Sequence, residues 1–185
     1  MKNLIETYSF ILERISFYFQ NESKCWHLNN LNAIGVDYHQ TPIDFIYNKL
    51  KIIENEISLK GKRFLDVGSG VGHICAVAKI FGCEPEGIEI NPVLLRISQI
   101  LYPDIKIHHQ NILSFEDYYN YDVIFYYIPF HDIKLEDWLV KKIENDSKIE
   151  SYIIIHDARG VEKDNRFIWV DKDDNKKQVW KKISN

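Results

Sequence analysis

A short glycine-rich stretch constrains the fold of this chain more than any other feature of its sequence. It reads FLDVGSGVGH, so an apolar run containing Asp66 passes directly into a loop made of Gly68, Ser69, Gly70, Val71 and Gly72. Glycine lets the backbone adopt a positive φ and approach a ligand closely. A helix that begins after such a loop also presents unpaired amides. The stretch therefore predicts a strand, a ligand-binding loop and a helix in succession.

β-rich and helical patterns alternate around this loop. We expect strands at 63–67, 86–90, 105–109, 123–128 and 149–155, and helices from Thr41 and at 74–81, 91–101 and 135–143. The first helix should have the Thr41 hydroxyl as its cap and Pro42 at its first position, and Gly61 should stop it. Gly82 should close the second helix, and Asn91 and Pro92 should cap the third. Alternation of this kind predicts an α/β, Rossmann-like fold, with a mostly parallel sheet and helices on both faces. Two last β-rich runs, 166–170 and 177–180, predict a C-terminal antiparallel hairpin.

The charge balance argues against a general nucleic-acid binder. The net charge is −4 and the pI is about 6.0, so the chain lacks the positive field that such proteins use. Three lysine pairs, at 141–142, 176–177 and 181–182, leave a modest basic patch open, although such pairs are more often solvated. Nucleic acid is therefore a less favoured partner.

Cysteines and histidines predict neither disulfides nor a metal site. Cys25, Cys75 and Cys83 are odd in number and lack CxxC spacing, which suits a reducing cytoplasm. His108 and His109 are adjacent on a predicted strand and should point to opposite faces, so we expect no metal. The apolar N-terminal stretch is too polar for a membrane span and lacks a cleavage site. We expect a soluble cytoplasmic protein without a targeting segment.

A carboxylate near the end of the second predicted strand adds specificity to the glycine loop. Glu89, in EGIEINP, lies seventeen positions after Gly72. A carboxylate there can accept hydrogen bonds from both ribose hydroxyls of an adenosine group. Dinucleotide-binding loops use the spacing GxGxxG, whereas this chain has GxGxG. The pair of features indicates an adenosine-containing ligand.

With these two motifs the chain resembles the class I S-adenosylmethionine-dependent methyltransferases, over roughly residues 41–155. The resemblance implies that S-adenosylmethionine is the cofactor, with Asp66, Gly68, Ser69, Gly70 and Gly72 around its methionine part. It implies that Glu89 holds the ribose and that Ile90 packs on the adenine. Relatives often carry an acidic residue after the third strand, where this chain has Asn111; its carbonyl can still accept from the adenine amino group.

The segment after the fourth predicted strand should face the methyl acceptor. There the resemblance places Tyr127, Pro129, Phe130 and His131. Relatives that methylate the amine of adenine or glutamine carry Asn or Asp followed by two prolines and an aromatic residue. This chain has Tyr127, Ile128, Pro129 and Phe130 there instead. A looser resemblance, to the protein-lysine methylating subgroup, rests on GVDYHQTP and implies that Tyr38 and Thr41 help to close the cofactor pocket. We therefore expect a protein amine as acceptor, with a small molecule as the alternative. Tyr126, Tyr127 and Phe130 are candidates for an aromatic wall around it, of which strand alternation lets at most part face the pocket.

Methyl transfer from a sulfonium needs alignment and exclusion of water more than it needs a base. If the acceptor must lose a proton, His131 is the first candidate to accept it, and His156 and Asp157 are others.

The chain length of 185 residues predicts a single domain spanning 1–185. Residues 1–40 would form an amphipathic helix and a possible lid, 41–160 the cofactor-binding core, and 161–185 the hairpin. Two other functions stay open. One is a nicotinamide-dependent oxidoreductase; the other is a catalytically silent module that binds the cofactor.

Overall fold

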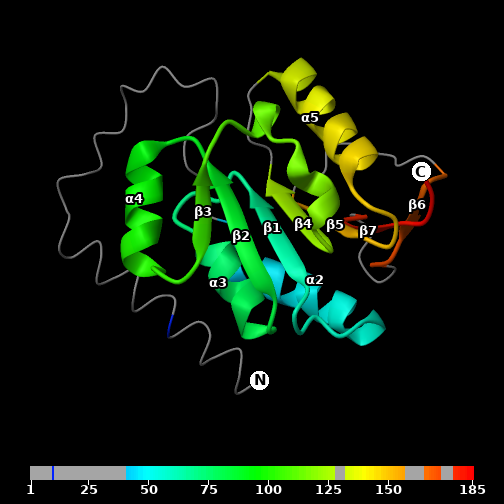
Figure 1. Cartoon of the computed structure of the whole chain (residues 1–185). Helices are drawn as coiled ribbons and strands as arrows, with labels where there is room; N and C mark the ends of the chain where they lie inside the picture. The colour runs from blue at the N-terminus through cyan, green and yellow to red at the C-terminus, as the bar shows by residue number, and fades with distance from the viewer. Residues whose placement is uncertain (1–9, 11–40, 128–131, 157–164, 172–176) are drawn as a thin grey trace.

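The centre of the computed structural model, which describes residues 10, 41–127, 132–156, 165–171 and 177–185, is one twisted sheet (Figure 1). Its seven strands lie in the order β3-β2-β1-β4-β5-β7-β6. Their bounds are β1 Arg63–Val67, β2 Glu84–Glu89, β3 Lys106–His109, β4 Val123–Tyr127, β5 Tyr152–His156, β6 Phe167–Trp169 and β7 Val179–Lys182. The helices are α2 Ile43–Glu56, α3 His73–Ile80, α4 Pro92–Leu101 and α5 Ile133–Asp146.

The strand pairing confirms the predicted Rossmann-like sheet. β1 to β5 are parallel to their neighbours, whereas β7 pairs antiparallel with both β5 and β6. The direction of the chain through the sheet reverses between β1 and β4, where Val67 lies opposite Tyr126. In open α/β sheets, ligands bind beyond the carboxyl ends of the strands at such a switch point.

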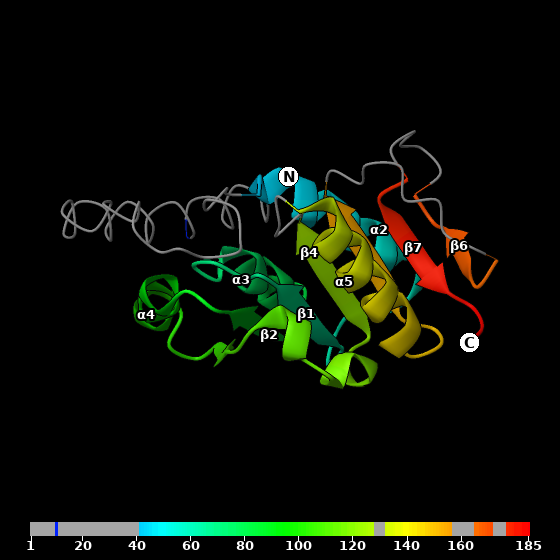
Figure 2. The same ribbon diagram turned by 90° about the horizontal axis from the view of Figure 1, so that it is seen from above.

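Two hydrophobic layers cover the two faces of the sheet. α2, α3 and α4 pack on one face, while α5 and two short 3₁₀ turns, η1 Ile112–Ser114 and η2 Asp117–Asn120, pack on the other (Figure 2). Side chains alternate between these layers along each strand, so Phe64 belongs to the first and Leu65 to the second. The strands are continuously apolar because both faces of the sheet are covered.

The ends of the first described helix differ from the prediction. α2 begins at Ile43 with Pro42 as its N-cap and without a side-chain capping bond, so the predicted Thr41 hydroxyl cap is wrong. Gly61 does not stop the helix, which has already ended at Glu56. The carboxylate of Glu54 accepts the amide of Leu59 at 2.7 Å, and this bond turns the chain out of the helix.

Two other helix ends are as predicted. Gly82 closes α3 at φ 83°, with its amide donating to the carbonyl of Lys79 and the next amide donating to Ala78. Asn91 caps α4 and accepts the amide of Val93 at 2.9 Å, with Pro92 as the first helical residue. Cys75 and Cys83 are free thiols packed in the core, as expected. The predicted helix and lid in residues 1–40 lie outside the described residues, except for Phe10.

Buried lysines connect the C-terminal strands to the rest of the fold. Lys49 of α2 pairs with Asp171, which follows β6. Lys182 of β7 is fully buried, and its ammonium donates to the carbonyls of Glu144, Asn145 and Ser147 at the end of α5.

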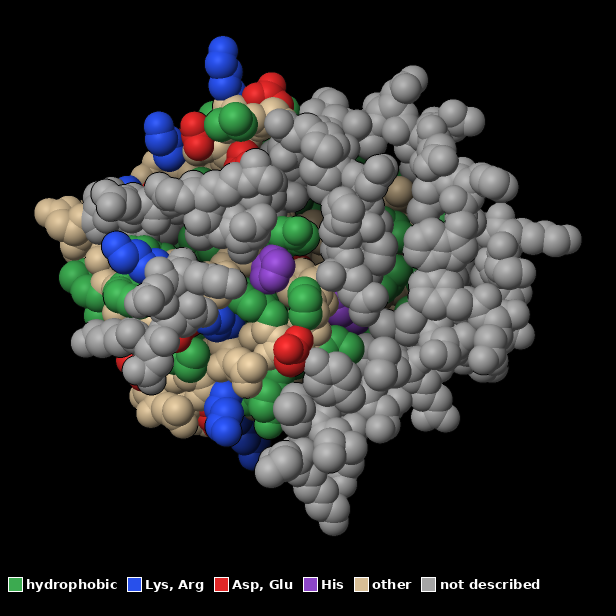
Figure 3. All heavy atoms as spheres, turned by 180° about the vertical axis from the view of Figure 1, so that it is seen from behind, with side chains coloured by type: hydrophobic (Ala, Val, Ile, Leu, Met, Phe, Trp, Pro, Cys, Tyr) green, Lys and Arg blue, Asp and Glu red, His purple; other side chains and the backbone are tan. Residues whose placement is uncertain are grey.

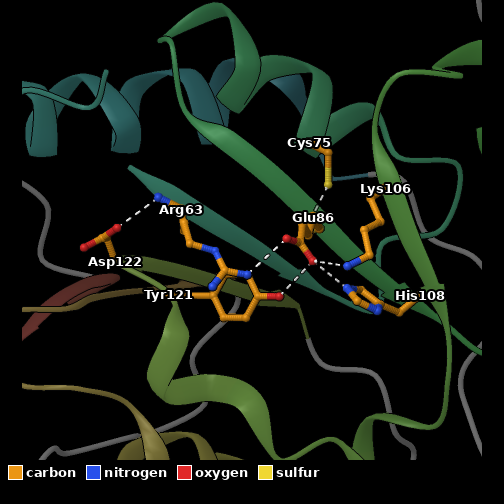
Figure 4. A network of polar contacts seen from close by, with 7 residues as sticks. All are labelled: Arg63, Cys75, Glu86, Lys106, His108, Tyr121 and Asp122. Carbon is orange, nitrogen blue, oxygen red and sulfur yellow. Dashed lines mark hydrogen bonds and ion pairs between the residues drawn. The ribbon is translucent and has the colours of Figure 1, made fainter. Parts of the chain in front are cut away.

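A charged network links β1, β2 and β3 on the face that carries η1 and η2 (Figure 4). Glu86 accepts hydrogen bonds from Arg63, Lys106, His108 and Tyr121, at 2.6–3.3 Å. Burial alone would raise the pKa of Glu86, but these donors together lower it to about 2. His109 bonds elsewhere, to the carbonyl of Ile90.

Within the described parts of the chain, no helix is long and apolar enough to span a bilayer.

Candidate active site

The glycine loop joins β1 to α3 at the switch point. Gly68, Gly70 and Gly72 all have positive φ, at 86°, 53° and 82°. Side chains with a Cβ rarely adopt this region, so the three glycines are needed for the path of the loop. Gly72 is also the N-cap of α3.

Amides of this loop are satisfied within the protein. Those of Gly68 and Ser69 both donate to the carbonyl of Ile88, at 3.0 and 2.8 Å. The amide of Gly70 donates to Glu89, and that of Gly72 to the carbonyl of Ser69. These four amides therefore do not form an anion-binding nest of the kind that holds phosphates.

Glu89 ends β2 directly beside the loop. Its Oε2 accepts the amide of Gly70 at 2.8 Å and its Oε1 accepts the amide of Asn91 at 2.7 Å. Burial raises the pKa of Glu89, and the bonds from Asn91 and Gly70 oppose that rise. The side chain is thus held in one orientation, and its carboxylate keeps acceptor capacity for a ligand.

Asp66 lies on the face of β1 that packs against α3. The residue is 2% exposed, and the thiol of Cys75 lies 3.9 Å from its Oδ2. Burial, and then the negative charge of Glu89, raise the pKa of Asp66 from 3.8 to about 8, while the thiol lowers it. Two buried carboxyl groups therefore lie beneath the glycine loop.

Sequence reasoning missed Gly87, which determines how closely the loop approaches β2. A Cβ at this position would lie 2.6 Å from both Cβ and Oγ of Ser69. Ser69 is buried against this gap, and its hydroxyl has no hydrogen-bond partner among the described residues. The signal was present, because a glycine inside a strand pattern often marks a close backbone approach.

Two further predicted residues lie at neighbouring strand ends. Ile90 follows β2 and is 53% exposed, which leaves its side chain available to a flat ligand. Asn111 follows β3, and its Oδ1 accepts the amide of Leu113 at 2.9 Å. The Asn111 side chain therefore caps η1 and keeps one carbonyl lone pair for another donor.

Aromatic side chains gather where β4 and β5 end. Tyr127 lies opposite His156 in the parallel register, and their rings meet edge to face with centroids 4.6 Å apart. Phe45 of α2 packs on the same imidazole at 4.3 Å and 88°. Tyr126 is buried under α5 on the opposite face, as alternation along a strand requires, so of the two tyrosines only Tyr127 can belong to the predicted aromatic wall.

Thr41 lies next to the first turn of α3. It is buried, and its backbone carbonyl is 3.1 Å from Nε2 of His73. Burial lowers the pKa of His73 to about 4, so this imidazole is neutral at pH 7.

The predicted residues Tyr38, Pro129, Phe130, His131 and Asp157 lie outside the described residues. Across the described ranges, no three His, Cys, Asp or Glu side chains converge as a metal site would require.

Comparisons with known proteins relate the chain to others by fold. No family model matches it, and neither does any curated protein. A protein from Haemophilus influenzae, provisionally named a methylase, matches with a TM-score of 0.59 and 13% identity, over 77% of this chain and 100% of that one. An RNA methyltransferase from Salinibacter ruber, solved with S-adenosylhomocysteine, matches with a TM-score of 0.55 and 17% identity, over 78% of this chain and 92% of that one.

A third structure, an amino pentose methyltransferase from Micromonospora echinaspora solved with S-adenosylmethionine, matches with a TM-score of 0.53 and 18% identity. The match covers 65% of this chain and 57% of that one, so this chain spans little more than half of that enzyme. At these identities the likeness shows that the chain has the Rossmann-like fold of these methyltransferases.

Proposed function

We propose that this protein is an S-adenosylmethionine-dependent methyltransferase. The observation that supports this most is a pair of buried carboxyl groups, Asp66 and Glu89, beneath a glycine loop in which four amides donate within the protein. Such a site suits a ligand that carries positive charge, and S-adenosylmethionine carries an ammonium and a sulfonium. The carboxylate at the ribose position suits its adenosine part.

In this proposal the cofactor lies across the carboxyl ends of β1, β2 and β3. Its methionine part is next to Asp66 and the loop residues Gly68, Ser69, Gly70 and Gly72, and Glu89 accepts from the ribose hydroxyls. Ile90 packs on the adenine, and Asn111 accepts from the adenine amino group. Tyr38 and Thr41 would close the site from the side of α2.

The rival nicotinamide-dependent reaction is less well supported. A dinucleotide places its pyrophosphate at the glycine loop and the following helix N-terminus. Here the amides of Gly68, Ser69 and Gly70 have protein acceptors, and the carboxylate of Glu89 would repel the phosphates.

The acceptor would enter where β4 and β5 end, past Tyr127, Pro129 and Phe130. S-adenosylmethionine bound there would supply the methyl group, and S-adenosylhomocysteine would be the leaving group when the acceptor's lone pair takes it. If the acceptor loses a proton, His131 or His156 accepts it; the ring of His156 is held by Phe45 and Tyr127.

We favour a protein amine as the acceptor, with a small molecule as the alternative. Basic, acidic and apolar side chains are interspersed over the described part of the face in Figure 3, without the broad basic field that nucleic acids bind. Relatives in fold act on RNA and on an amino sugar, so fold does not choose among acceptor classes. A silent module would bind the cofactor without transferring its methyl group.

Titration calorimetry with S-adenosylmethionine and with NADH tests the cofactor. We expect binding of the first only. Replacing Glu89 with Ala should weaken the binding of S-adenosylmethionine by about 2 kcal/mol, because hydrogen bonds to a charged acceptor are lost. Glu84→Ala, at an exposed position of the same strand, is the matched control and should bind normally. Binding of NADH alone would overturn the proposal.

Labelling tests the acceptor. The protein is incubated with tritiated S-adenosylmethionine and extract from its own host, and label is then separated into protein, nucleic acid and small molecules. Label in protein supports an amine acceptor, whereas label confined to another fraction refutes it. Cofactor binding without any labelling would support the silent module.

A further inference from the structure

Asp66 and Glu89 are two carboxyl groups buried on one face of the site. Asp66 lies opposite Gly87 in the parallel register of β1 and β2, and Glu89 is two residues further along the same face. The two residues are 2% and 7% exposed. Two carboxylates buried this near to each other oppose one another's ionisation, and the pair holds a proton more tightly than either group alone.

The surroundings of the two carboxyl groups differ. Glu89 accepts backbone amides with both oxygens, at 2.8 and 2.7 Å, and such bonds favour its charged form. Asp66 has a weak thiol donor at 3.9 Å. Burial and the charge of Glu89 raise the pKa of Asp66 to about 8, so at neutral pH Asp66 is the partner that holds the proton.

Neighbouring elements place no positive charge against Asp66 within the described residues. On α3, Cys75 is a thiol whose pKa is raised by burial, and His73 is neutral because burial lowers its pKa to about 4. On β4 the residue opposite is Phe125. On β3, His109 attracts the charge of Glu89. If Asp66 became a second negative charge beside Glu89, a cationic group of a ligand would therefore be needed to balance it.

We propose that Asp66 gives up its proton to solvent when the cofactor binds, so that a positive charge of the cofactor takes the place of that proton beside Glu89. This inference rests on the proposed function. The cation is either the ammonium, which S-adenosylhomocysteine shares, or the sulfonium, which it lacks. Binding should tighten about tenfold for each unit by which the pH rises toward neutral, because one proton is released per cofactor bound.

The experiment is calorimetric titration of the intact protein between pH 6 and 7, in buffers of different ionisation enthalpy. In this range the ammonium of the ligand stays charged. We expect nearly one proton released with S-adenosylmethionine, and almost none for Asp66→Asn. The control Asp104→Asn makes the same change at an exposed carboxylate, 68% exposed and paired with Lys79, and should behave as the wild type.

Each result has one meaning. Release with S-adenosylhomocysteine as well identifies the ammonium as the cation, and release with S-adenosylmethionine alone identifies the sulfonium. Binding without proton release refutes the inference but keeps the proposed function, whereas absence of binding refutes the proposed function. If Asp66→Asn does not bind, infrared spectra of the ligand-free proteins decide. The band of a protonated carboxyl must be present in the wild type and missing in the variant, and its absence from the wild type also refutes the inference.

Discussion

Gly87 has no side chain, and this allows the glycine loop to lie close to β2. The space where a Cβ would stand is occupied by Ser69, with Cδ1 of Ile107 also only 2.7 Å from it. No other residue type fits there without moving the loop, because the close contacts include the Cβ of Ser69 and not only the flexible end of a side chain.

We predict that Gly87→Ala lowers the free energy of unfolding by about 2 kcal/mol, because the new methyl group overpacks this contact. Adding Ser69→Gly should recover part of that loss, since it removes the two Ser69 atoms that lie 2.6 Å from the new Cβ. Urea denaturation of the two single variants and the double variant measures the coupling. Simply additive losses would show that Ser69 is not the obstacle.

A second prediction for a single residue concerns Asp66 and the stability of the protein without cofactor. The unfolded chain loses this proton near pH 3.8, whereas the folded chain keeps it until about pH 8. The folded-state pKa is raised, so the contribution to stability is complete below about pH 4 and is lost as the pH rises toward 8. Asp66→Asn removes this loss and should raise the free energy of unfolding at pH 7 by about 2 kcal/mol. Urea denaturation of both proteins from pH 5 to 8 tests it, and parallel pH profiles would contradict it.

Among the elements, α5 depends on a lysine that is far from it in sequence. The ammonium of Lys182 lies 2.9, 3.1 and 2.6 Å from the carbonyls of Glu144, Asn145 and Ser147. These carbonyls lie at the end of the helix, where backbone acceptors lack partners within the helix and where positive charge is favoured. β7 thus caps α5 through one side chain.

We predict that Lys182→Met lowers the free energy of unfolding by about 3 kcal/mol, because buried carbonyl acceptors lose their donor. The control is Lys181→Met, at the neighbouring lysine. Its partner Glu150 is 67% exposed, so that loss should stay below about 1 kcal/mol. Chemical denaturation monitored by circular dichroism compares the two, and equal losses would exclude a special role for Lys182.

For the whole molecule, Lys49 and Asp171 join regions 122 positions apart in sequence. Their side chains are 6% and 3% exposed, so the pair is shielded from water, and the ammonium also lies 5.5 Å from the ring of Phe45. The pair connects α2, which also carries Phe45, to the residue that lies two positions after β6.

We predict that Lys49→Met costs about 4 kcal/mol of stability, because Asp171 is left as an unpaired buried charge. The double variant with Asp171→Leu should cost less than this single change. Lys79→Met, which breaks the exposed pair with Asp104, serves as the control and should cost under about 1 kcal/mol. Melting temperatures of the four proteins test this, and a double variant less stable than Lys49→Met would contradict it.

Local patterns in the sequence predicted the kinds of elements and their order. β1 was predicted at its observed bounds, and the predictions of a helix start at Asn91 and a helix end at Gly82 are confirmed. These features depend on neighbours in the chain, through side-chain periodicity, capping bonds and positive φ. The glycine loop and the carboxylate at the end of β2 belong to the same group, because their spacing along the chain was enough to identify them.

The contacts between groups far apart in the sequence became visible in the folded protein. The fold placed β7 between β5 and β6, extended β2 back to Glu84 by pairing it with Arg63, and packed Ser69 over Gly87. It also brought Asp66 beside Glu89 and Lys49 to Asp171. Strand order, register and burial set these contacts, and each depends on surfaces contributed by several segments at once. No local pattern in the sequence encodes them, because the energy of a buried charge or a close backbone contact is defined only after the surrounding elements have packed.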